Sequence, residues 1–107
     1  MYCVILITAK DAQEAQRIAN RLLEEKLIAC ANIIKDVQSF FWWEGKIDQA
    51  KEVMLVIKTK RSLFARVAKA VKKAHSYNVP EIIALPIVAG YNPYLQWISA
   101  STKKGKR

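Results

Sequence analysis

The chain has 107 residues, of which 52% are hydrophobic and 25% are charged, and this balance excludes an intrinsically disordered protein. The length predicts one domain with a packed core. The apolar runs at 2–7 and 53–57 are too short to cross a bilayer, and no basic segment or cleavage site follows Met1. We therefore expect a cytoplasmic protein that does not enter the membrane.

The net charge of +9 is unevenly distributed along the chain. From Lys58 to His75 there are seven basic residues and no acidic ones. Such a stretch is typical either of a surface for nucleic acid or another polyanion, or of one solvated helix face. No nucleic-acid-binding motif accompanies it, which favours the solvated face. Residues 103–107 form a basic tail that we expect to be disordered, after a single domain at 1–102.

The first half of the chain predicts a strand, a helix and two long strands. The run at 2–7 is apolar and rich in β-branched residues, as in a central strand buried on both faces. Asp11 or Thr8 is a candidate cap for a helix that ends near Lys26. Residues 28–43 and 46–58 are strand-like, and the two residues Glu44 and Gly45 connect them in a tight turn.

The second half predicts another helix, a strand and a short helix. Ser62 is a candidate cap for the second helix, which has an apolar side and a basic side. The strand-like run at 82–89 contains Pro86, which lacks an N–H, so this strand should be an edge or should bulge there. A short final helix is expected around 94–98.

The long hairpin is the unusual element. Strands usually contain ~5–6 residues, whereas each arm here has more than twice that number and would span over ~40 Å at ~3.3 Å per residue. We therefore expect the hairpin to bend, to bulge or to project beyond the helices.

The order of elements is βαββαβ followed by a helix. This order predicts an α+β ferredoxin-like sandwich, with a four-stranded antiparallel sheet and both main helices on one face. The other face would carry apolar side chains without helices above it. The fold therefore predicts contact between sheets of different subunits.

Four aromatic residues precede the hairpin turn. Because side chains alternate along a strand, Phe40 and Trp42 should share one face, and Phe41 and Trp43 the other. One small domain cannot cover both faces of such a ribbon. Exposed apolar patches of this size mark interaction surfaces, so we expect partners, most simply further copies of the chain.

Several segments, in the same order, resemble the divalent-cation-tolerance protein CutA family over nearly the whole chain, from about residue 4 to 101. The most specific blocks are Trp42-Trp43-Glu44-Gly45-Lys46-Ile47 and Val79-Pro80-Glu81-Ile82-Ile83. The other matching blocks are Leu27–Ile33, Glu52-Val53, Lys58-Thr59 and Tyr94–Trp97.

The resemblance implies a ferredoxin-like subunit in a tight homotrimer similar to PII-type signalling trimers. It also implies a role in tolerance of copper and other divalent metals, with copper binding and no established catalysis. In such a trimer, Phe41, Trp42, Trp43 and Glu44 would form an interface clasp.

His75 is the one histidine of the sequence and the first candidate metal ligand, because imidazole suits copper or zinc. It stands where the family usually shows His-Pro-Tyr, although Ser76 replaces the proline here. The family's described copper ligands include a cysteine and a second histidine, whose matching positions are Ile7 and Ala74. The alternative interpretation is a histidine hydrogen-bonded to backbone at a helix end.

Glu81 and Cys30 are further candidate metal ligands. A thiolate suits Cu(I), but the small neighbours of Cys30 also fit a buried structural thiol. Cys3 and Cys30 lack metal-ligand or CxxC spacing, so free thiols and a disulfide between neighbouring strands both stay open.

Lys58, Tyr77 and Glu81 are candidates for a ligand cleft between subunits. They support an alternative function, a PII-like sensor of a small anion. A small enzyme such as an acylphosphatase is a third hypothesis, which the lack of a phosphate-binding loop disfavours.

Overall fold

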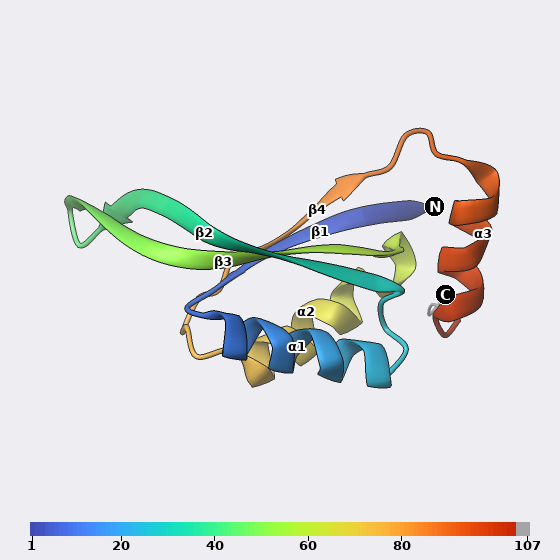
Figure 1. Cartoon of the computed structure of the whole chain (residues 1–107), viewed down its shortest axis with the longest axis horizontal. Helices are drawn as coiled ribbons and strands as arrows, with labels where there is room; N and C mark the ends of the chain where they lie inside the picture. The colour runs from blue at the N-terminus through green and yellow to red at the C-terminus, as the bar shows by residue number, and fades with distance from the viewer. Residues whose placement is uncertain (105–107) are drawn as a thin grey trace.

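The elements of the fold follow the predicted order (Figure 1). In the computed structural model, which describes residues 1–104, the strands are β1 (Tyr2–Ala9), β2 (Cys30–Trp43), β3 (Lys46–Lys60) and β4 (Ile82–Pro86). The helices are α1 (Ala12–Glu24), α2 (Phe64–Ala74) and α3 (Asn92–Ser101), with a 3-10 turn at Arg61–Leu63. The α+β βαββαβ prediction is confirmed.

The strands form one antiparallel sheet in the order β2-β3-β1-β4. β1 is central, as predicted. β4 lies at an edge and ends at Pro86, which agrees with the prediction from the missing proline N–H. The expectation that β1 is buried on both faces is wrong for the single chain. From Tyr2 to Ile7 its residues alternate between half-buried and fully buried, because the helices cover one face only, and Thr8 and Ala9 at its end are both buried.

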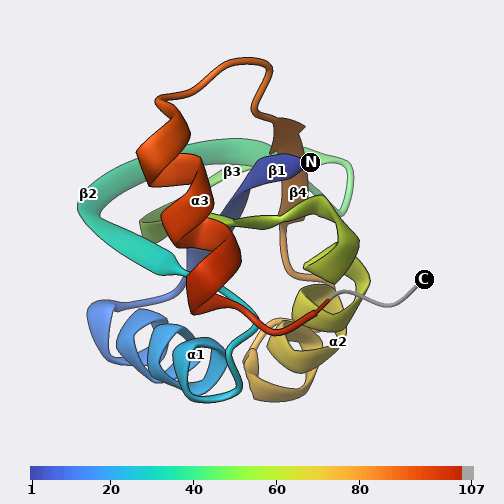
Figure 2. The same ribbon diagram turned by 90° about the vertical axis from the view of Figure 1, so that its right-hand side faces the viewer.

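Helices α1 and α2 lie side by side beneath the sheet, as Figure 2 shows. The core between the two layers consists of aliphatic side chains that alternate along the strands and recur at helical spacing on α1 and α2. Its fully buried members include Ile5, Ile7, Leu55 and Ile57 from the strands, and Ile18, Leu22, Val67 and Val71 from the helices.

The two helices begin in different ways. Asp11 caps α1, and its side chain accepts a hydrogen bond from the Glu14 N–H at 2.8 Å, as predicted. The prediction that Ser62 caps the second helix is wrong. A 3-10 turn leads directly into α2, and the Phe64 N–H donates to the Arg61 carbonyl in place of a side-chain cap.

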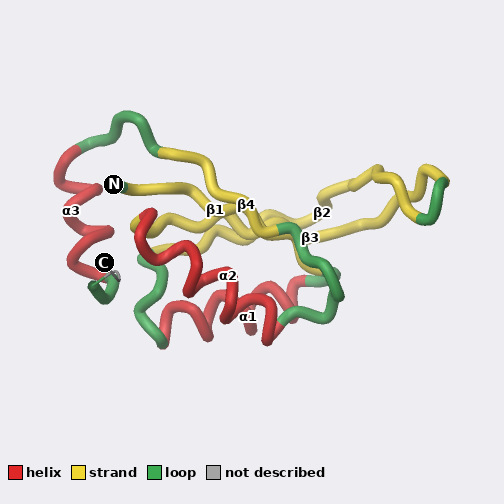
Figure 3. Tube along the Cα trace, turned by 180° about the vertical axis from the view of Figure 1, so that it is seen from behind, coloured by secondary structure: helices red, strands yellow, loops and turns green. Residues whose placement is uncertain are grey.

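The β2–β3 hairpin projects beyond the rest of the sheet (Figure 3). The pairing of β1 with β3 ends at Ala9 and Val53, so residues 46–52 of β3 pair with β2 alone. The register shifts between Ile34 and Val37, with Asp36 at φ 60°, which is a β-bulge. The predicted bulge and projection are both present.

The hairpin turn uses two residues in left-handed conformation. Glu44 has φ 50° and Gly45 has φ 78°, and Trp43 pairs with Lys46 on either side. Positive φ at both central positions is typical of a type I′ turn, whose twist matches that of the strands.

The sheet face opposite α1 and α2 lacks a helical layer, and we call it the open sheet face. Strand alternation places seven apolar side chains on it: Val4, Leu6, Ile34, Met54, Val56, Ile83 and Leu85. Three of them, Ile34, Ile83 and Leu85, are each 49% exposed. This face is therefore an extended apolar surface of the single chain.

Helix α3 lies at the end of the sheet where the chain begins (Figure 1). The side chains of Tyr2 and Ser99 are hydrogen-bonded at 2.6 Å. Beyond α3, the Lys103 N–H donates to the Lys26 carbonyl at 2.9 Å, while the remainder of the predicted tail, 105–107, lies outside the described residues. None of the helices within 1–104 is long and apolar enough to span a membrane.

Replacement of Ile57 by Ala should lower the free energy of unfolding by about 2–5 kcal/mol, because it leaves a cavity between sheet and helices. Val88→Ala is the matched control, since Val88 is 94% exposed, and it should change stability by no more than about 0.5 kcal/mol. Urea unfolding at one fixed protein concentration measures both values. Equal effects of the two substitutions would contradict the assigned core.

Candidate functional site

His75 lies directly after α2 and is buried against the end of β1. Its Nδ1 accepts the backbone N–H of Tyr77 at 3.0 Å, and its Nε2 lies 2.7 Å from the Thr8 carbonyl oxygen. Since a backbone N–H can only donate, Nδ1 is the acceptor and Nε2 carries the proton that is donated to Thr8. Both ring nitrogens are thus used by backbone partners in a neutral imidazole.

Glu14, in the first turn of α1, is the fully buried carboxylate beside this histidine. Its Oε1 accepts the Lys10 N–H at 3.1 Å, and its Oε2 accepts the Ser76 N–H at 2.8 Å. Lys10 precedes α1 and Ser76 follows α2. One side chain therefore joins the two loops at the same end of the sheet.

The surroundings of Glu14 favour its ionised form. Burial alone would raise its pKa, but hydrogen bonds from Ser76 and from the Lys10 and Ser76 backbone outweigh burial and lower the pKa. The Arg17 guanidinium adds a contact at 3.8 Å. Glu14 is consequently a buried anion held mainly by backbone N–H groups.

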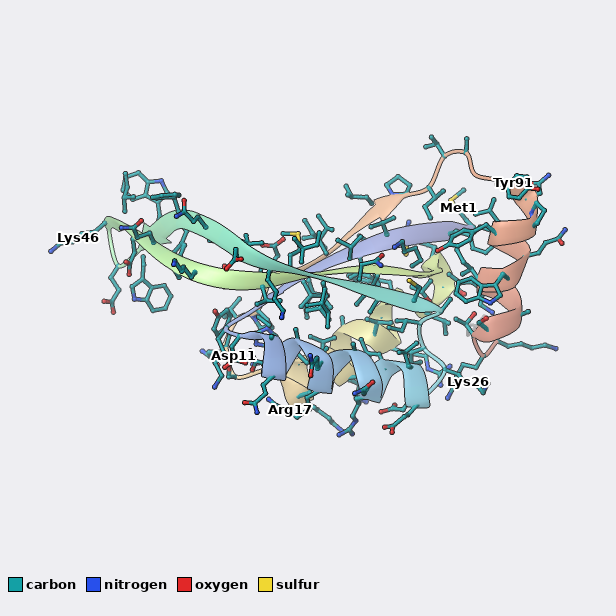
Figure 4. All side chains as sticks on the ribbon, in the orientation of Figure 1. Met1, Asp11, Arg17, Lys26, Lys46 and Tyr91 are labelled. Atoms are coloured by element: carbon teal, nitrogen blue, oxygen red, sulfur yellow. The ribbon has the colours of Figure 1, made fainter. Side chains whose placement is uncertain are left out.

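Tyr77 extends this network to the base of the hairpin. Its hydroxyl donates to Glu52 Oε2 at 2.7 Å, and its ring lies 4.7 Å from the His75 ring between centroids. Burial and the hydrogen bond to the Glu52 carboxylate raise the pKa of Tyr77, which keeps the hydroxyl a donor. Asp11, at the start of α1, lies below the point where the hairpin leaves the sheet (Figure 4).

A second polar cluster lies toward the other end of the sheet, on the open sheet face. Cys30 and Lys58 are cross-strand partners, with the sulfur 3.9 Å from the lysine Nζ, which also donates to the Asn32 side chain. Burial and the neighbouring Cys30 raise the pKa of Tyr94, which comes from α3. Cys30 is half-buried and, like Cys3, is a free thiol.

The donors of one chain do not fit a resident metal centre. Within residues 1–104, no three His, Cys, Asp or Glu side chains are grouped to hold an ion. Ligation by His75 would require one of its two backbone hydrogen bonds to be released. An ammonium group faces Cys30, and Glu81 lies exposed just before β4. A metal site would need ligands from more than one copy.

The candidate ligand-cleft residues do not all meet within one chain. Lys58 pairs with Val4 at one end of β1, whereas His75 and Tyr77 lie near Thr8, four residues further, about 13 Å at ~3.3 Å per residue. Glu81 precedes Ile82, which pairs with Ile7, so it belongs to the Tyr77 end. Lys58 and Tyr77 of the same chain therefore do not meet.

The aromatic residues of the hairpin are exposed in the single chain. Trp42 is 73% exposed and Trp43 61%, and Phe41 is also exposed. Glu44 occupies the turn, where Lys46 points away from the body of the molecule (Figure 4). The aromatic side chains therefore present apolar surface to solvent in the single chain.

Glu14 is a site residue that was not expected from the sequence, although a local signal for it is present. Asp11 followed by Glu14 has the spacing of a capping box, in which the third helical residue reaches back to the start of the helix. In the structure Glu14 reaches the Lys10 N–H, one residue before the cap. Its second partner, Ser76, is 62 residues away and is not visible in any local pattern.

Comparisons with known proteins agree on one family. The family model described as "CutA1 divalent ion tolerance protein" matches residues 3–101. The divalent-cation tolerance protein CutA of Archaeoglobus fulgidus is 48% identical over 96% of this chain and 100% of that protein. The chloroplastic protein CutA 1 of Oryza sativa subsp. japonica is 42% identical over 94% of this chain, which spans 57% of the rice protein.

A solved structure has the same fold. The structure described as the periplasmic divalent cation tolerance protein CutA from Archaeoglobus fulgidus has a TM-score of 0.94 to this chain at 48% identity. The superposition covers 96% of this chain and 100% of the other. The shared architecture therefore includes the projecting hairpin as well as the helical layer.

Glu14→Gln should lower the free energy of unfolding at pH 7 by about 1–3 kcal/mol, because the amide cannot accept both backbone N–H groups as the carboxylate does. A lowered folded-state pKa stabilises the protein above the unfolded value of ~4.3 and loses this effect as the pH falls. The difference between wild type and variant should therefore shrink below about pH 4.

Denaturant unfolding across pH 3–7 measures this difference, and Glu24→Gln, an exposed change on the same helix, is the control. A constant difference between wild type and Glu14→Gln at every pH would contradict an ionised, backbone-bound Glu14.

Proposed function

This chain belongs to the CutA1 divalent ion tolerance family, and from that premise we propose that it is a cytoplasmic homotrimer that acts in tolerance of divalent metals, chiefly copper. It acts by binding metal or by signalling at subunit interfaces rather than by catalysis. The observation that carries the proposal is the family match over residues 3–101, joined to an apolar surface that one chain leaves uncovered.

The open sheet face supports assembly. Its seven apolar side chains form a continuous surface across β2, β3, β1 and β4, with cross-strand neighbours such as Leu6 and Val56. The aromatic residues of the hairpin extend apolar surface beyond the sheet. Apolar patches of this extent on a small domain mark contacts with other protein chains, and closed symmetric assemblies of identical chains are the commonest solution.

The arrangement of donors supports metal binding between subunits. A single chain groups too few ligands for an ion within residues 1–104. The exposed carboxylate of Glu81 and the half-buried thiol of Cys30 are accessible from outside, and His75 lies on the loop before Glu81. In a symmetric assembly, each copy would contribute the same donors to an interface. Together they could form a weak divalent-metal site that one chain lacks.

The alternative function is sensing of a small anion at a cleft between subunits. It requires Lys58 of one copy to approach Tyr77 or Glu81 of another, because one chain separates them along β1. This alternative is favoured by the hydrogen bond from Lys58 to Asn32, which orients the half-buried ammonium group as a candidate anion contact.

The double variant Trp42→Ser and Trp43→Ser should weaken assembly, because it removes both exposed indole rings from the hairpin. Native mass measured at micromolar concentration should show a trimer for wild type and smaller species for the variant. Leu23→Ser, which changes an exposed apolar residue on α1, is the control and should remain trimeric. A monomeric wild type would refute the trimer. A double variant that remained a stable trimer would show that the two indole rings are not part of the trimer interface.

Calorimetric titration with Cu(II) should show saturable binding by the assembled protein. The His75→Ala variant should bind more weakly, because imidazole is the best nitrogen ligand for copper available. Glu24→Gln controls for a lost surface carboxylate. Unchanged binding by His75→Ala excludes this residue as a ligand, and no saturable binding by wild type contradicts the metal-binding proposal.

A further inference from the structure

A groove of about 420 Å³ lies between α1 and α2 on the helical layer. Its floor includes Leu27 and Ala70, and its walls carry the charged side chains of both helices. The helical layer is the one that Figure 2 shows beneath the sheet, away from the open sheet face. Contact between copies through the sheet would leave this groove open to solvent.

The groove has an excess of positive charge. Four cations line it, namely Arg21, Arg66, Lys69 and Lys73, against one carboxylate, Glu25. That carboxylate is used locally, since Glu25 Oε2 accepts from Arg21 Nε at 2.9 Å on the same helix. The three cations from α2 have no ion-pair partner within residues 1–104. The groove therefore carries three uncompensated positive charges.

The three cations form a stripe along α2. Positions 66, 69 and 73 are related by steps of three and four residues, which places their side chains on one side of a helix. At ~1.5 Å rise per residue the stripe is about 10 Å long. A chain of linked phosphates can follow the whole stripe and offers each cation its own phosphate group, which a single phosphate does not.

The residue types match phosphate chemistry. The planar guanidinium of Arg66 can bind two phosphate oxygens at once, and the lysine ammonium groups act as mobile point charges. Arg66 is half-buried, which limits its conformational freedom, while Lys69 and Lys73 are exposed. Arg17, on the underside of α1 in Figure 4, is paired with Glu14 and does not line the groove.

We propose that the groove between α1 and α2 binds a small oligophosphate, with Arg66, Lys69 and Lys73 as its contacts. The shared chemistry is two or more linked phosphates, which free inorganic polyphosphate and the phosphate tail of a nucleotide both provide. This site is separate from the subunit interface and from any metal site. If the groove did not bind oligophosphate, the proposed function in metal tolerance would be unaffected.

The test is calorimetric titration of the full chain with sodium tripolyphosphate in metal-free buffer. We expect saturable binding of one tripolyphosphate per chain, at least tenfold weaker binding of orthophosphate, and no binding of adenosine. ATP distinguishes the two sources: affinity equal to that of tripolyphosphate indicates recognition of phosphates alone, and tighter binding indicates a nucleotide. Binding should weaken as salt rises, because the groove is solvent-exposed.

The triple variant Arg66→Gln, Lys69→Gln and Lys73→Gln should weaken tripolyphosphate binding at least tenfold. The matched control removes three charges outside the groove through Lys10→Gln, Lys35→Gln and Lys51→Gln, all exposed positions. The control should bind within about twofold of wild type. Circular dichroism checks that both variants are folded.

Three results would overturn the proposal: equal weakening in both triple variants, no saturable tripolyphosphate binding, or orthophosphate binding as tight as tripolyphosphate. Duplex DNA that bound more tightly than tripolyphosphate and equally well to both triple variants would instead assign the basic charge to a diffuse nucleic-acid surface, and would likewise refute a specific groove.

Discussion

Coverage of only one face of the sheet is the constraint on which the rest of the structure depends. Two helices pack against one side of four strands and bury a continuous aliphatic core there. Among residues 1–104 there is no further long helix for the other side, and α3 lies only at one end of the sheet. The open sheet face follows from this coverage, and the proposed contact with further copies of the chain rests on it.

The polar network of Glu14, His75, Tyr77 and Glu52 fixes the end of the sheet from which the hairpin departs. The hairpin pairs only with itself beyond Val53, so its direction depends on what holds its base. Backbone N–H groups from two loops converge on one buried carboxylate, and a tyrosine hydroxyl reaches β3 from the same loop. Every member has a partner, as buried polar groups require. The histidine is thus first a structural residue of the fold.

The two layers divide the molecule by chemistry. The sheet side presents aliphatic and aromatic surface, which favours contact with other chains. The helical side presents charge, and its α2 stripe gathers cations in a groove rather than spreading them. A polar outer layer keeps an assembled protein in solution, and on this chain the same layer carries the proposed oligophosphate site. The proposed assembly and the proposed oligophosphate binding would therefore use opposite sides of one small domain.

The sequence by itself determined the order of elements, the edge position of β4, the tight turn and the exposed aromatic ribbon, because each depends on local geometry: proline without an N–H, glycine with positive φ, alternation along strands. The prediction that Ser62 caps the second helix was wrong. The Glu14 network and the α1–α2 groove were not visible in the sequence. Those features join residues far apart in the chain, such as Glu14 and Ser76. Only the packing of helices on the sheet decided them, because long-range contacts have no sequence period.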